Sequence, residues 1–410
     1  MTLKSSAESH LDRSGDDNGS LANFLDSWSE QDYLTGGWGG YREKLSNRGI
    51  DIFGYYEATV LGNPIGGKKK GLAYAGLLDL FINLDLEKLI GINGSSFRIS
   101  GSWSSGRSLT EDFIGNFFDA SSTFNGDSIR LYQLYFEQFL FDDNLNIALG
   151  RMGTGDEFMT SPIFYSFVSL AFDQNPASIF FNIPSFTADP ASTWGARARV
   201  SPIRQFYAMF GVYDSNPNAG KEGFRNIDLA IIGEAFLIGE IGFVLNGDED
   251  SNGLPGNYKL GGYYDTSKFS TLSDPESMKR GNYGFYLIME QMVYKEAGNG
   301  SDQGLRPFLT FTLAPSDDIN TFPFFFSTGL VYKGLFSGRD HDTTSFGLAY
   351  GKVSKEIRGQ DFEMVMELTH VFAITPWLTI QPDVQYVIHP HGSSEIPNAF
   401  VIGFGLDVNL

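Results

Sequence analysis

The chain ends in Ala399-Phe-Val-Ile-Gly-Phe-Gly-Leu-Asp-Val-Asn-Leu410, and this stretch decides the fold. One parity holds large apolar residues: Phe400, Ile402, Phe404, Leu406, Val408 and Leu410. The other holds mainly small or polar residues: Val401, Gly403, Gly405, Asp407 and Asn409. Because successive side chains of a strand point to opposite faces, the pattern predicts a strand with one apolar face. A soluble sheet must cover such a face, whereas an outer-membrane barrel turns it toward lipid.

The composition agrees with a barrel and excludes several other classes. The 410 residues include no cysteine, which excludes disulfide scaffolds and cysteine-ligated metal sites. The 37 Phe and 19 Tyr suit aromatic girdles, and the 48 Gly suit a crowded inner wall. The net charge of -20 argues against a nucleic-acid partner. These features are typical of a bacterial envelope protein.

Helical membrane spans and a signal peptide are not visible in the pattern. The most apolar run, Leu229–Leu245, contains Glu234, Glu240 and three glycines, which do not suit a helix in hydrocarbon. Met1-Thr-Leu-Lys leads directly into a polar tract, so for an exported protein we expect either a mature form that carries a start methionine or a trimmed chain.

The chain divides into three predicted parts. Residues 1–31 are polar and acidic and are expected to form a flexible lead-in. Residues 32–50 predict a periplasmic segment with a short helix between Gly39 and Asn47. Residues 51–410 are alternating runs separated by Gly, Asn, Asp, Ser and Pro clusters, which is the pattern of hairpins.

The spacing of these runs predicts an all-β transmembrane antiparallel barrel. We count sixteen strands, among them 129–141, 229–245 and 282–294. Short connections alternate with long ones, and the longest are expected at 105–128, 155–191 and 266–281. Outer-membrane barrels have short periplasmic turns and longer external loops, so both termini are expected on the periplasmic side.

Several stretches together resemble the carbohydrate-selective porin family, the OprB-type porins. They occur in order along residues 32–410 and comprise Leu34-Thr-Gly-Gly-Trp-Gly-Gly40 with Gly49-Ile50, Asp85-Leu-Glu-Lys-Leu-Ile-Gly91, Gly106-Arg-Ser-Leu109, Ile114-Gly-Asn-Phe117, Arg130-Leu-Tyr-Gln-Leu-Tyr-Phe-Glu-Gln138, Gly150-Arg-Met152, Asn175-Pro176, Gly334-Leu-Phe-Ser-Gly-Arg-Asp-His-Asp342 and Pro376-Trp-Leu-Thr-Ile-Gln-Pro-Asp-Val-Gln385. The resemblance implies a sixteen-stranded outer-membrane barrel that passes monosaccharides, glucose especially, by facilitated diffusion. The chain departs from the family in ending on Leu410, where such barrels usually end in an aromatic residue.

Strand parity assigns the residues of the lumen independently of the resemblance. On 129–141, Tyr132 falls on the lipid side, while Gln133 and Glu137 fall inside. A charge facing lipid at mid-bilayer costs about 2–4 kcal/mol for Arg or Lys, which enforces the parity. Polar lumen groups can replace the water of a hexose, so we expect these residues to bind substrate. The full predicted set is Arg98, Gln133, Glu137, Arg197, Arg199, Glu240, Lys259, Glu290, Glu363, Glu367, Gln381, Asp383 and Gln385.

The segment 155–191 is too apolar for an ordinary external loop, so we expect it to enter the barrel and narrow it. Its predicted constriction residues are Phe158, Phe164, Tyr165, Phe167, Phe172, Phe180 and Phe181. The alternative is an exposed loop that packs on its own side chains. Residues 106–124 are a second candidate for an inward fold.

Signals for catalysis and metal binding are weak. His389-Pro-His391 lacks a third ligand at suitable spacing. Glu363 and Glu367 share a strand face, but no pattern separates their pKa values as a glycosidase requires. The sequence therefore predicts no enzyme, no metal and no cofactor.

The predicted function is a passive porin for neutral sugars, in contact with outer-membrane lipid and either monomeric or homotrimeric. Two alternatives stay open. One is a general or cation-preferring porin, suggested by the charge of -20, in which opposed Arg and Glu neutralise each other. The other is a secreted all-β carbohydrate-binding protein with the same strands in packed sheets.

Overall fold

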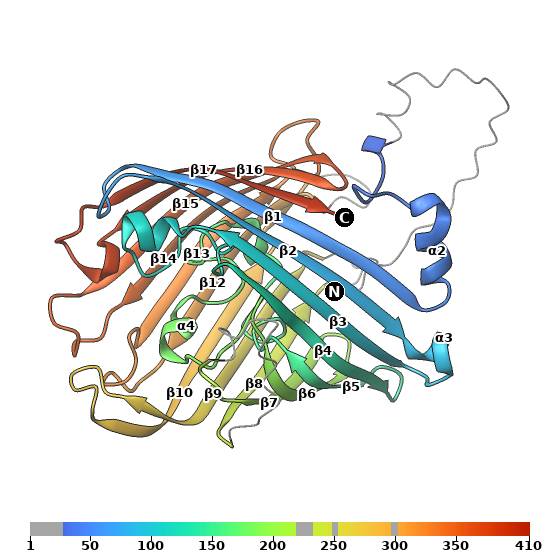
Figure 1. Cartoon of the computed structure of the whole chain (residues 1–410), viewed down its shortest axis with the longest axis horizontal. Helices are drawn as coiled ribbons and strands as arrows, with labels where there is room; N and C mark the ends of the chain where they lie inside the picture. Colours follow the sequence, from blue (N-terminus) through green and yellow to red (C-terminus); the bar gives the residue numbers. More distant parts are fainter. Residues whose placement is uncertain (1–27, 219–232, 248–252, 297–301) are drawn as a thin grey trace.

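The strands form one sheet that closes on itself. The computed structural model describes residues 28–218, 233–247, 253–296 and 302–410. All neighbouring strands are antiparallel, and the ring closes where the first strand pairs with the last (Figure 1). The strands are β1 (Ile50–Ile65), β2 (Leu72–Asp85), β3 (Ser95–Gly106), β4 (Ser128–Leu140), β5 (Leu145–Met152), β6 (Thr193–Ile203), β7 (Phe206–Asp214), β8 (Ala235–Leu245), β9 (Gly256–Ser270), β10 (Met278–Gln291), β11 (Tyr294–Lys295), β12 (Gly304–Leu313), β13 (Phe324–Lys333), β14 (Thr343–Lys352), β15 (Phe362–Thr375), β16 (Leu378–Ile388) and β17 (Ala399–Asn409).

The ring has the sixteen strand positions that the sequence predicts, because β10 and β11 together occupy one of them. Two-residue β11 pairs with β12 and continues the edge that β10 presents to the same strand. A closed ring contradicts the alternative of a secreted protein with packed sheets, because no sheet edge remains to form a second layer.

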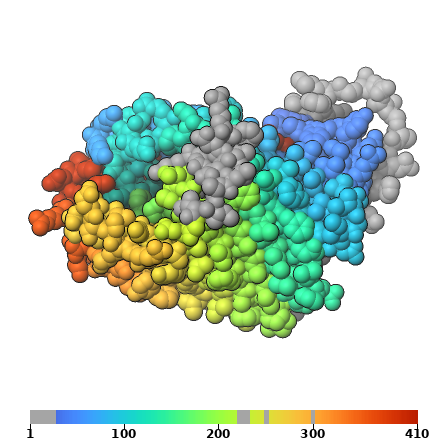
Figure 2. Space-filling model, turned by 60° about the horizontal axis from the view of Figure 1, so that its bottom comes forward, coloured from blue at the N-terminus to red at the C-terminus, as the bar shows by residue number. Residues whose placement is uncertain are grey.

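The closing strand β17 shows why these residues form a wall. Ile402 and Phe404 expose 49% and 46% of their surface on the outer face, whereas Val401 on the inner face is fully buried. The same alternation runs around the barrel, and Figure 2 shows the outer wall over the green and yellow strands β6–β10. An apolar outer face of this kind is the one that lipid solvates.

The N-terminal segment lies beside the C-terminus at one end of the barrel. Its helical part is η1 (Trp38–Gly40) followed by α2 (Tyr41–Ser46), where the sequence predicts a helix. The Leu34 N–H donates to the Asn409 carbonyl at 2.8 Å, and Arg42 Nη2 donates to the Leu410 carbonyl at 3.0 Å. Residues 1–27 of the predicted lead-in lie outside the described residues.

The remaining helices of the described chain are short. They are α3 (Leu86–Ile90), η2 (Thr110–Ile114), η3 (Phe164–Ser166), α4 (Ser178–Asn182) and η4 (Pro390–Gly392). Over the ranges that the structure describes, no helix is long and apolar enough to cross a membrane.

Two expectations about the wall are wrong. The predicted long loop 266–281 is mostly strand, because β9 and β10 continue as a polar hairpin and leave only 271–277 between them. Tyr132 faces inward and is 3% exposed. The reason is a bulge: Ser100 pairs with Gln133 but Gly101 pairs with Leu131, so the parity of β4 changes at Tyr132.

Two loops fold into the ring, and we name them L2 (107–127) and L3 (153–192). L3 carries α4 into the barrel interior (Figure 1). Its apolar side chains form one buried cluster with wall residues of β7, β8, β10, β12 and β14. L2 and L3 also bind each other, because the Ser122 N–H donates to the Val168 carbonyl at 3.0 Å and the Leu170 N–H to the Asp119 carbonyl at 2.9 Å.

Candidate functional site

Glu363 on β15 fastens L2 to the wall. Its carboxylate accepts hydrogen bonds from the backbone N–H of Phe117 and of Phe118, each at 2.8 Å. It also accepts from the His391 N–H at 2.7 Å, in the loop between β16 and β17. Glu363 is fully buried, so these backbone donors replace the water that its carboxylate loses.

Glutamates on three strands fasten L3 in the same way. Glu240 on β8 accepts from the Met159 N–H at 3.2 Å, and Glu367 on β15 accepts from the Val168 N–H at 2.7 Å. Glu290 on β10 accepts from Ser161 Oγ at 2.9 Å. We call Glu240, Glu290, Glu363 and Glu367 the anchor carboxylates.

Other predicted lumen residues also bind loop backbone. Lys259 Nζ donates to the Thr160 carbonyl at 2.7 Å. Gln381 Nε2 donates to the Ser166 carbonyl at 3.1 Å, and Gln385 Nε2 to the Ala120 carbonyl at 2.8 Å. A second contact of Gln385 Nε2 reaches Asp383 Oδ2 at 2.8 Å. All these side chains point inward as parity predicts, and their role as sugar ligands stays a prediction.

The aromatic side chains of L3 divide into buried and exposed ones. Phe158, Phe164, Phe167 and Phe172 are at most 3% exposed and lie against the wall, while Phe180 and Phe181 are half-buried beside the same cluster. Tyr165 is different, since it exposes 58% of its surface. It is the member of the predicted constriction set that solvent reaches most freely.

Wall glycines make room for the buried rings. A Cβ atom at Gly347 on β14 would lie 2.6 Å from the Phe172 ring, and one at Gly211 on β7 would lie 2.9 Å from the Phe158 ring. Both distances are shorter than ordinary van der Waals contact. L3 can therefore approach the wall closely because glycine stands at these two positions.

Two arginines lie on the inner wall at β6, away from the strands that carry the anchor carboxylates. Arg197 on β6 is ion-paired with Glu157 of L3 and, at 3.3 Å, with Glu137 on β4. Arg199 lies over the Tyr207 ring at 4.1 Å. Arg197 is buried, whereas Arg199 is half-buried.

Two further predicted residues lie on β3 and β4. Arg98 Nε donates to Asn83 Oδ1 at 2.7 Å, and the guanidinium faces the Tyr135 ring at 5.7 Å. Gln133 Nε2 donates to Asp156 Oδ2 of L3 at 2.9 Å. The arc from β3 to β6 therefore contacts L3 through a few side chains rather than through a run of backbone anchors.

A group of carboxylates between β1, β2 and L3 escaped the sequence prediction. We call Glu57, Asp79, Asp173 and Asp189 the acidic cluster. Tyr55 on β1 donates its hydroxyl to Asp189, and Thr123 of L2 donates to Glu57. A signal was available: Asp79 is a single charge within the apolar run Leu77-Leu-Asp-Leu-Phe81, on the inward parity of β2.

Burial changes the acidity of the loop carboxyls. Burial raises the pKa of Asp173 to about 7, and a hydrogen bond from Ser122 offsets part of this effect. Burial also raises the pKa of Asp156 to about 6, against hydrogen bonds from Tyr132 and Gln133. These loop carboxyls therefore titrate close to neutral pH.

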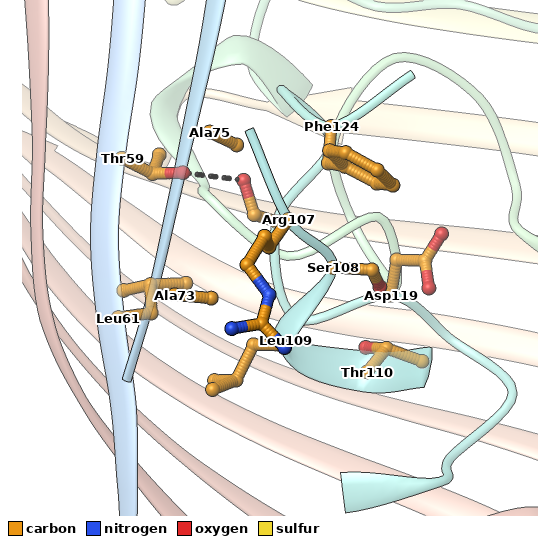
Figure 3. Close-up of a pocket in the computed structure, with 11 residues that line it drawn as sticks. Thr59, Leu61, Ala73, Ala75, Arg107, Ser108, Leu109, Thr110, Asp119 and Phe124 are labelled. Atoms are coloured by element: carbon orange, nitrogen blue, oxygen red, sulfur yellow. Dashed lines mark hydrogen bonds between the residues drawn. The ribbon is translucent and has the colours of Figure 1, made fainter. Parts of the chain in front are cut away.

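A small pocket lies between L2 and the inner faces of β1 and β2 (Figure 3). Thr59 of the wall and Ser121 of L2 are hydrogen-bonded at 2.8 Å across it. Arg107, Asp119 and Phe124 line its L2 side, and Arg107 is ion-paired with Asp112 at 2.7 Å. The pocket thus belongs to the contact between L2 and the wall.

Comparison with known proteins decides the family. A family model described as the carbohydrate-selective porin, OprB family, matches residues 69–410. The chain belongs to the carbohydrate-selective porin family. As a member, it is a channel of the bacterial outer membrane through which carbohydrates diffuse passively, and it is not an enzyme.

Two curated relatives and one solved structure are similar to this chain over nearly its whole length. Porin B of Pseudomonas aeruginosa is 27% identical over 94% of this chain and 93% of its own length. The putative porin QuiX of Acinetobacter baylyi is 26% identical over 95% of each chain. The high-pH structure of Pseudomonas putida OprB is 28% identical, has a TM-score of 0.86, and is matched over 93% of this chain and 99% of that one.

Proposed function

We propose that this carbohydrate-selective porin passes monosaccharides of the glucose type along the space between L3 and the β1–β6 arc of the wall. The half-buried polar side chains on this arc and its facing loop support the proposal: Arg98, Glu137, Glu157 and Arg199. A neutral hexose can exchange its water for such donors and acceptors one group at a time.

The attachment of L3 is the observation that carries the proposal. Glu240 on β8 and Glu367 on β15 accept hydrogen bonds from its backbone, and Glu290 on β10 accepts one from the Ser161 hydroxyl. Because these anchors hold the loop on the β8–β15 side, and only single side chains such as Arg197 and Gln133 contact it on the other side, we propose that the narrowed path runs along the β1–β6 arc. Tyr165, with 58% of its surface exposed, offers a ring face to the C–H side of a sugar.

The two arginines of β6 have different roles in this proposal. Arg197 is buried between Glu137 and Glu157, so it positions the two carboxylates. Arg199 is accessible and is proposed to contact the sugar. Replacing Arg199 with Ala should weaken sugar block of ion current, and Arg197→Ala should in addition make the open-channel current noisier because Glu157 loses its partner.

The outer wall supports the proposed contact with lipid, and the assembly state stays either monomeric or homotrimeric. Phe210, Leu260 and Phe285 expose 52–53% of their surface on the outside, which supports direct contact with outer-membrane lipid. One chain supplies both sides of the proposed path, so a monomer suffices for transport. A homotrimer would hold three separate paths.

Reconstitution into liposomes tests the proposed function. The purified porin should admit glucose readily and maltose slowly, because the path narrows at L3. Equal rates for both sugars at matched concentration would indicate a general porin, and entry of neither sugar into vesicles that conduct ions would contradict the proposal.

A further inference from the structure

The glycine-rich motif around Trp38 has no part in the proposed transport path, yet it makes well-defined contacts. Gly39 and Gly40 have φ values of 62° and 85°, a left-handed conformation that glycine adopts without steric cost. The centre of the Trp38 ring lies 4.4 Å from Arg42 Cζ, and the centre of the Tyr33 ring lies 3.9 Å from the same atom. Two cation–π contacts therefore fix the Arg42 guanidinium.

Arg42 reaches the end of the last strand of the barrel. Its Nη2 donates to the Leu410 carbonyl at 3.0 Å and to Thr35 Oγ1 at 3.1 Å. The Leu34 N–H donates to the Asn409 carbonyl at 2.8 Å. These donors come from outside the sheet, so the N-terminal segment continues the hydrogen bonding of β17 at the point where that strand ends.

Two tryptophans join the same segment to the turn between β15 and β16. Trp377 Nε1 donates to the Trp28 carbonyl at 3.1 Å, and the two ring centroids are 4.5 Å apart. Trp28 Nε1 in turn donates to the Leu34 carbonyl at 3.2 Å. The Trp377 carbonyl accepts from the Asn409 N–H at 2.9 Å. Residues 28–42, which we call the N-terminal clamp, thus contact β17 and the preceding turn together.

The N-terminal clamp lies where the ring closes. The ladder between β1 and β17 ends at the pair Tyr55 and Asn409, and the Leu410 N–H donates to the Gly54 carbonyl at 2.8 Å. Helix α2 follows the clamp and leads into β1, while the clamp itself lies beside the C-terminus (Figure 1). The clamp is therefore joined covalently to the first strand and non-covalently to the last one.

We propose that the N-terminal clamp is a lock on the closed barrel, which docks after β1 pairs with β17 and then holds this seam shut. In an open sheet the clamp and β17 belong to opposite edges, so their contact has to overcome the entropy of closing nearly the whole chain into a loop. Once the ring has closed, the clamp is tethered beside its binding surface at a high effective concentration. This role goes beyond the proposed function, because it concerns how the barrel stays closed rather than what passes through it.

Folding and unfolding rates of the full porin test the order of events. Contacts that form after the transition state slow unfolding and leave the folding rate unchanged. Arg42→Ala should therefore speed unfolding in urea about five- to thirtyfold and change the folding rate by less than about twofold, because it removes two cation–π contacts and two hydrogen bonds. Refolding into detergent micelles, followed by the heat-modifiable gel band, measures both rates. Arg48→Ala is the matched control, since Arg48 is an exposed arginine just after α2, and it should leave both rates unaltered.

Hydrogen exchange locates the effect on the seam. In Arg42→Ala the amides of residues 404–410 of β17 should exchange faster, while those of residues 145–149 of β5, at the same end of the barrel, should not change. Unaltered unfolding and exchange would overturn the lock. Slower folding with unaltered unfolding would also overturn it, because the clamp would then act before the ring closes.

A second variant decides the matter should Arg42→Ala not fold. Trp28→Ala removes the ring contact with Trp377 and leaves Arg42 in place. Faster unfolding of this variant with unchanged folding supports the lock. Wild-type rates in both directions would contradict it.

Discussion

Glu367 on β15 and Asp79 on β2 are both buried carboxylates of the inner wall, yet they are satisfied differently. Glu367 accepts from two successive backbone N–H groups of L3, Val168 and Ser169. Asp79 accepts from one serine and keeps one oxygen without a donor. The first arrangement holds a loop, and the second joins β2 to the neighbouring strand β3. Inward parity alone therefore does not distinguish a carboxylate that holds a loop from one that binds only the wall.

The difference divides the lumen into two arcs. Strands β8–β16 carry the anchor carboxylates and the glutamines that bind L2 and L3. Strands β1–β6 also carry half-buried charges, Glu57, Arg98, Glu137 and Arg199, that leave part of their surface exposed.

Removal of L3 should have the largest effect. Deletion of residues 163–186 takes away the contacts of Val168 and Ser169 with Glu367 and most of the buried rings. We expect single-channel conductance to rise several-fold, because the covered arc becomes open to ions, and discrimination between mono- and disaccharides to disappear. Planar-bilayer recordings measure both. Unchanged conductance in a heat-modifiable, folded variant would place the selectivity filter elsewhere.

Loss of an anchor should have a smaller effect in the same direction. Glu367→Gln replaces charge-assisted hydrogen bonds, each worth about 1.5–3 kcal/mol, with weaker ones. L3 should loosen, and the open-channel current should become noisier with a higher mean. Glu57→Gln is the matched change on the other arc and should leave the noise unaltered. The same noise in both variants would remove the distinction between the arcs.

A methyl group added to the wall should disturb L3 less than the loss of an anchor carboxylate does. Gly347→Ala places Cβ 2.6 Å from the Phe172 ring, and overpacking of this kind costs about 1–3 kcal/mol. Gly405→Ala on β17 is the control, because its nearest neighbour would be Gln381 Cβ at 3.6 Å. We expect a lower temperature of heat modification only for Gly347→Ala. Equal temperatures for the two variants would mean that L3 does not press on β14.

The smallest expected effect is a pH dependence that Asp173 contributes. Burial raises its pKa to about 7, above the unfolded value, so the folded state holds the proton more tightly. This contribution to stability is present at low pH and is lost as pH rises from the unfolded pKa through about 7. The heat-modification temperature should fall over that window, and it should fall less in Asp173→Asn. A wild-type temperature that rises with pH across the window would contradict the assignment.

The sequence predicts the wall well because lipid enforces its pattern. In β17 a shift by one residue would turn Asp407 toward hydrocarbon. The alternation of Ile402 and Phe404 with small residues therefore determines which face of the strand points to lipid. Tyr132 was misplaced because a bulge leaves no trace in the alternation of apolar residues. The loop 266–281 was overestimated because β9 and β10 continue as strands through polar residues such as Lys268 and Lys279.

The candidate site was less predictable. Parity correctly placed Glu240, Glu363 and Glu367 inside, but their partners are backbone N–H groups of L2 and L3, which follow no period. Asp173 and Asp189 lie on L3, where no strand pattern assigns a direction. The approach of Asp189 to Asp79 and of Asp173 to Glu57 depends on how L3 folds across the lumen, which is a property of tertiary packing.

L3 lies inside the barrel against the β8–β15 arc, and one cross-link tests this placement directly. Ser178 Oγ of α4 and Thr312 Oγ1 of β12 are 2.8 Å apart, and the chain has no cysteine of its own. In the double variant Ser178→Cys with Thr312→Cys, we predict that a disulfide forms in the folded porin and that conductance stays at the wild-type value. Two free thiols, both open to alkylation from the external side of intact cells, would show that L3 lies outside the barrel and would contradict the account.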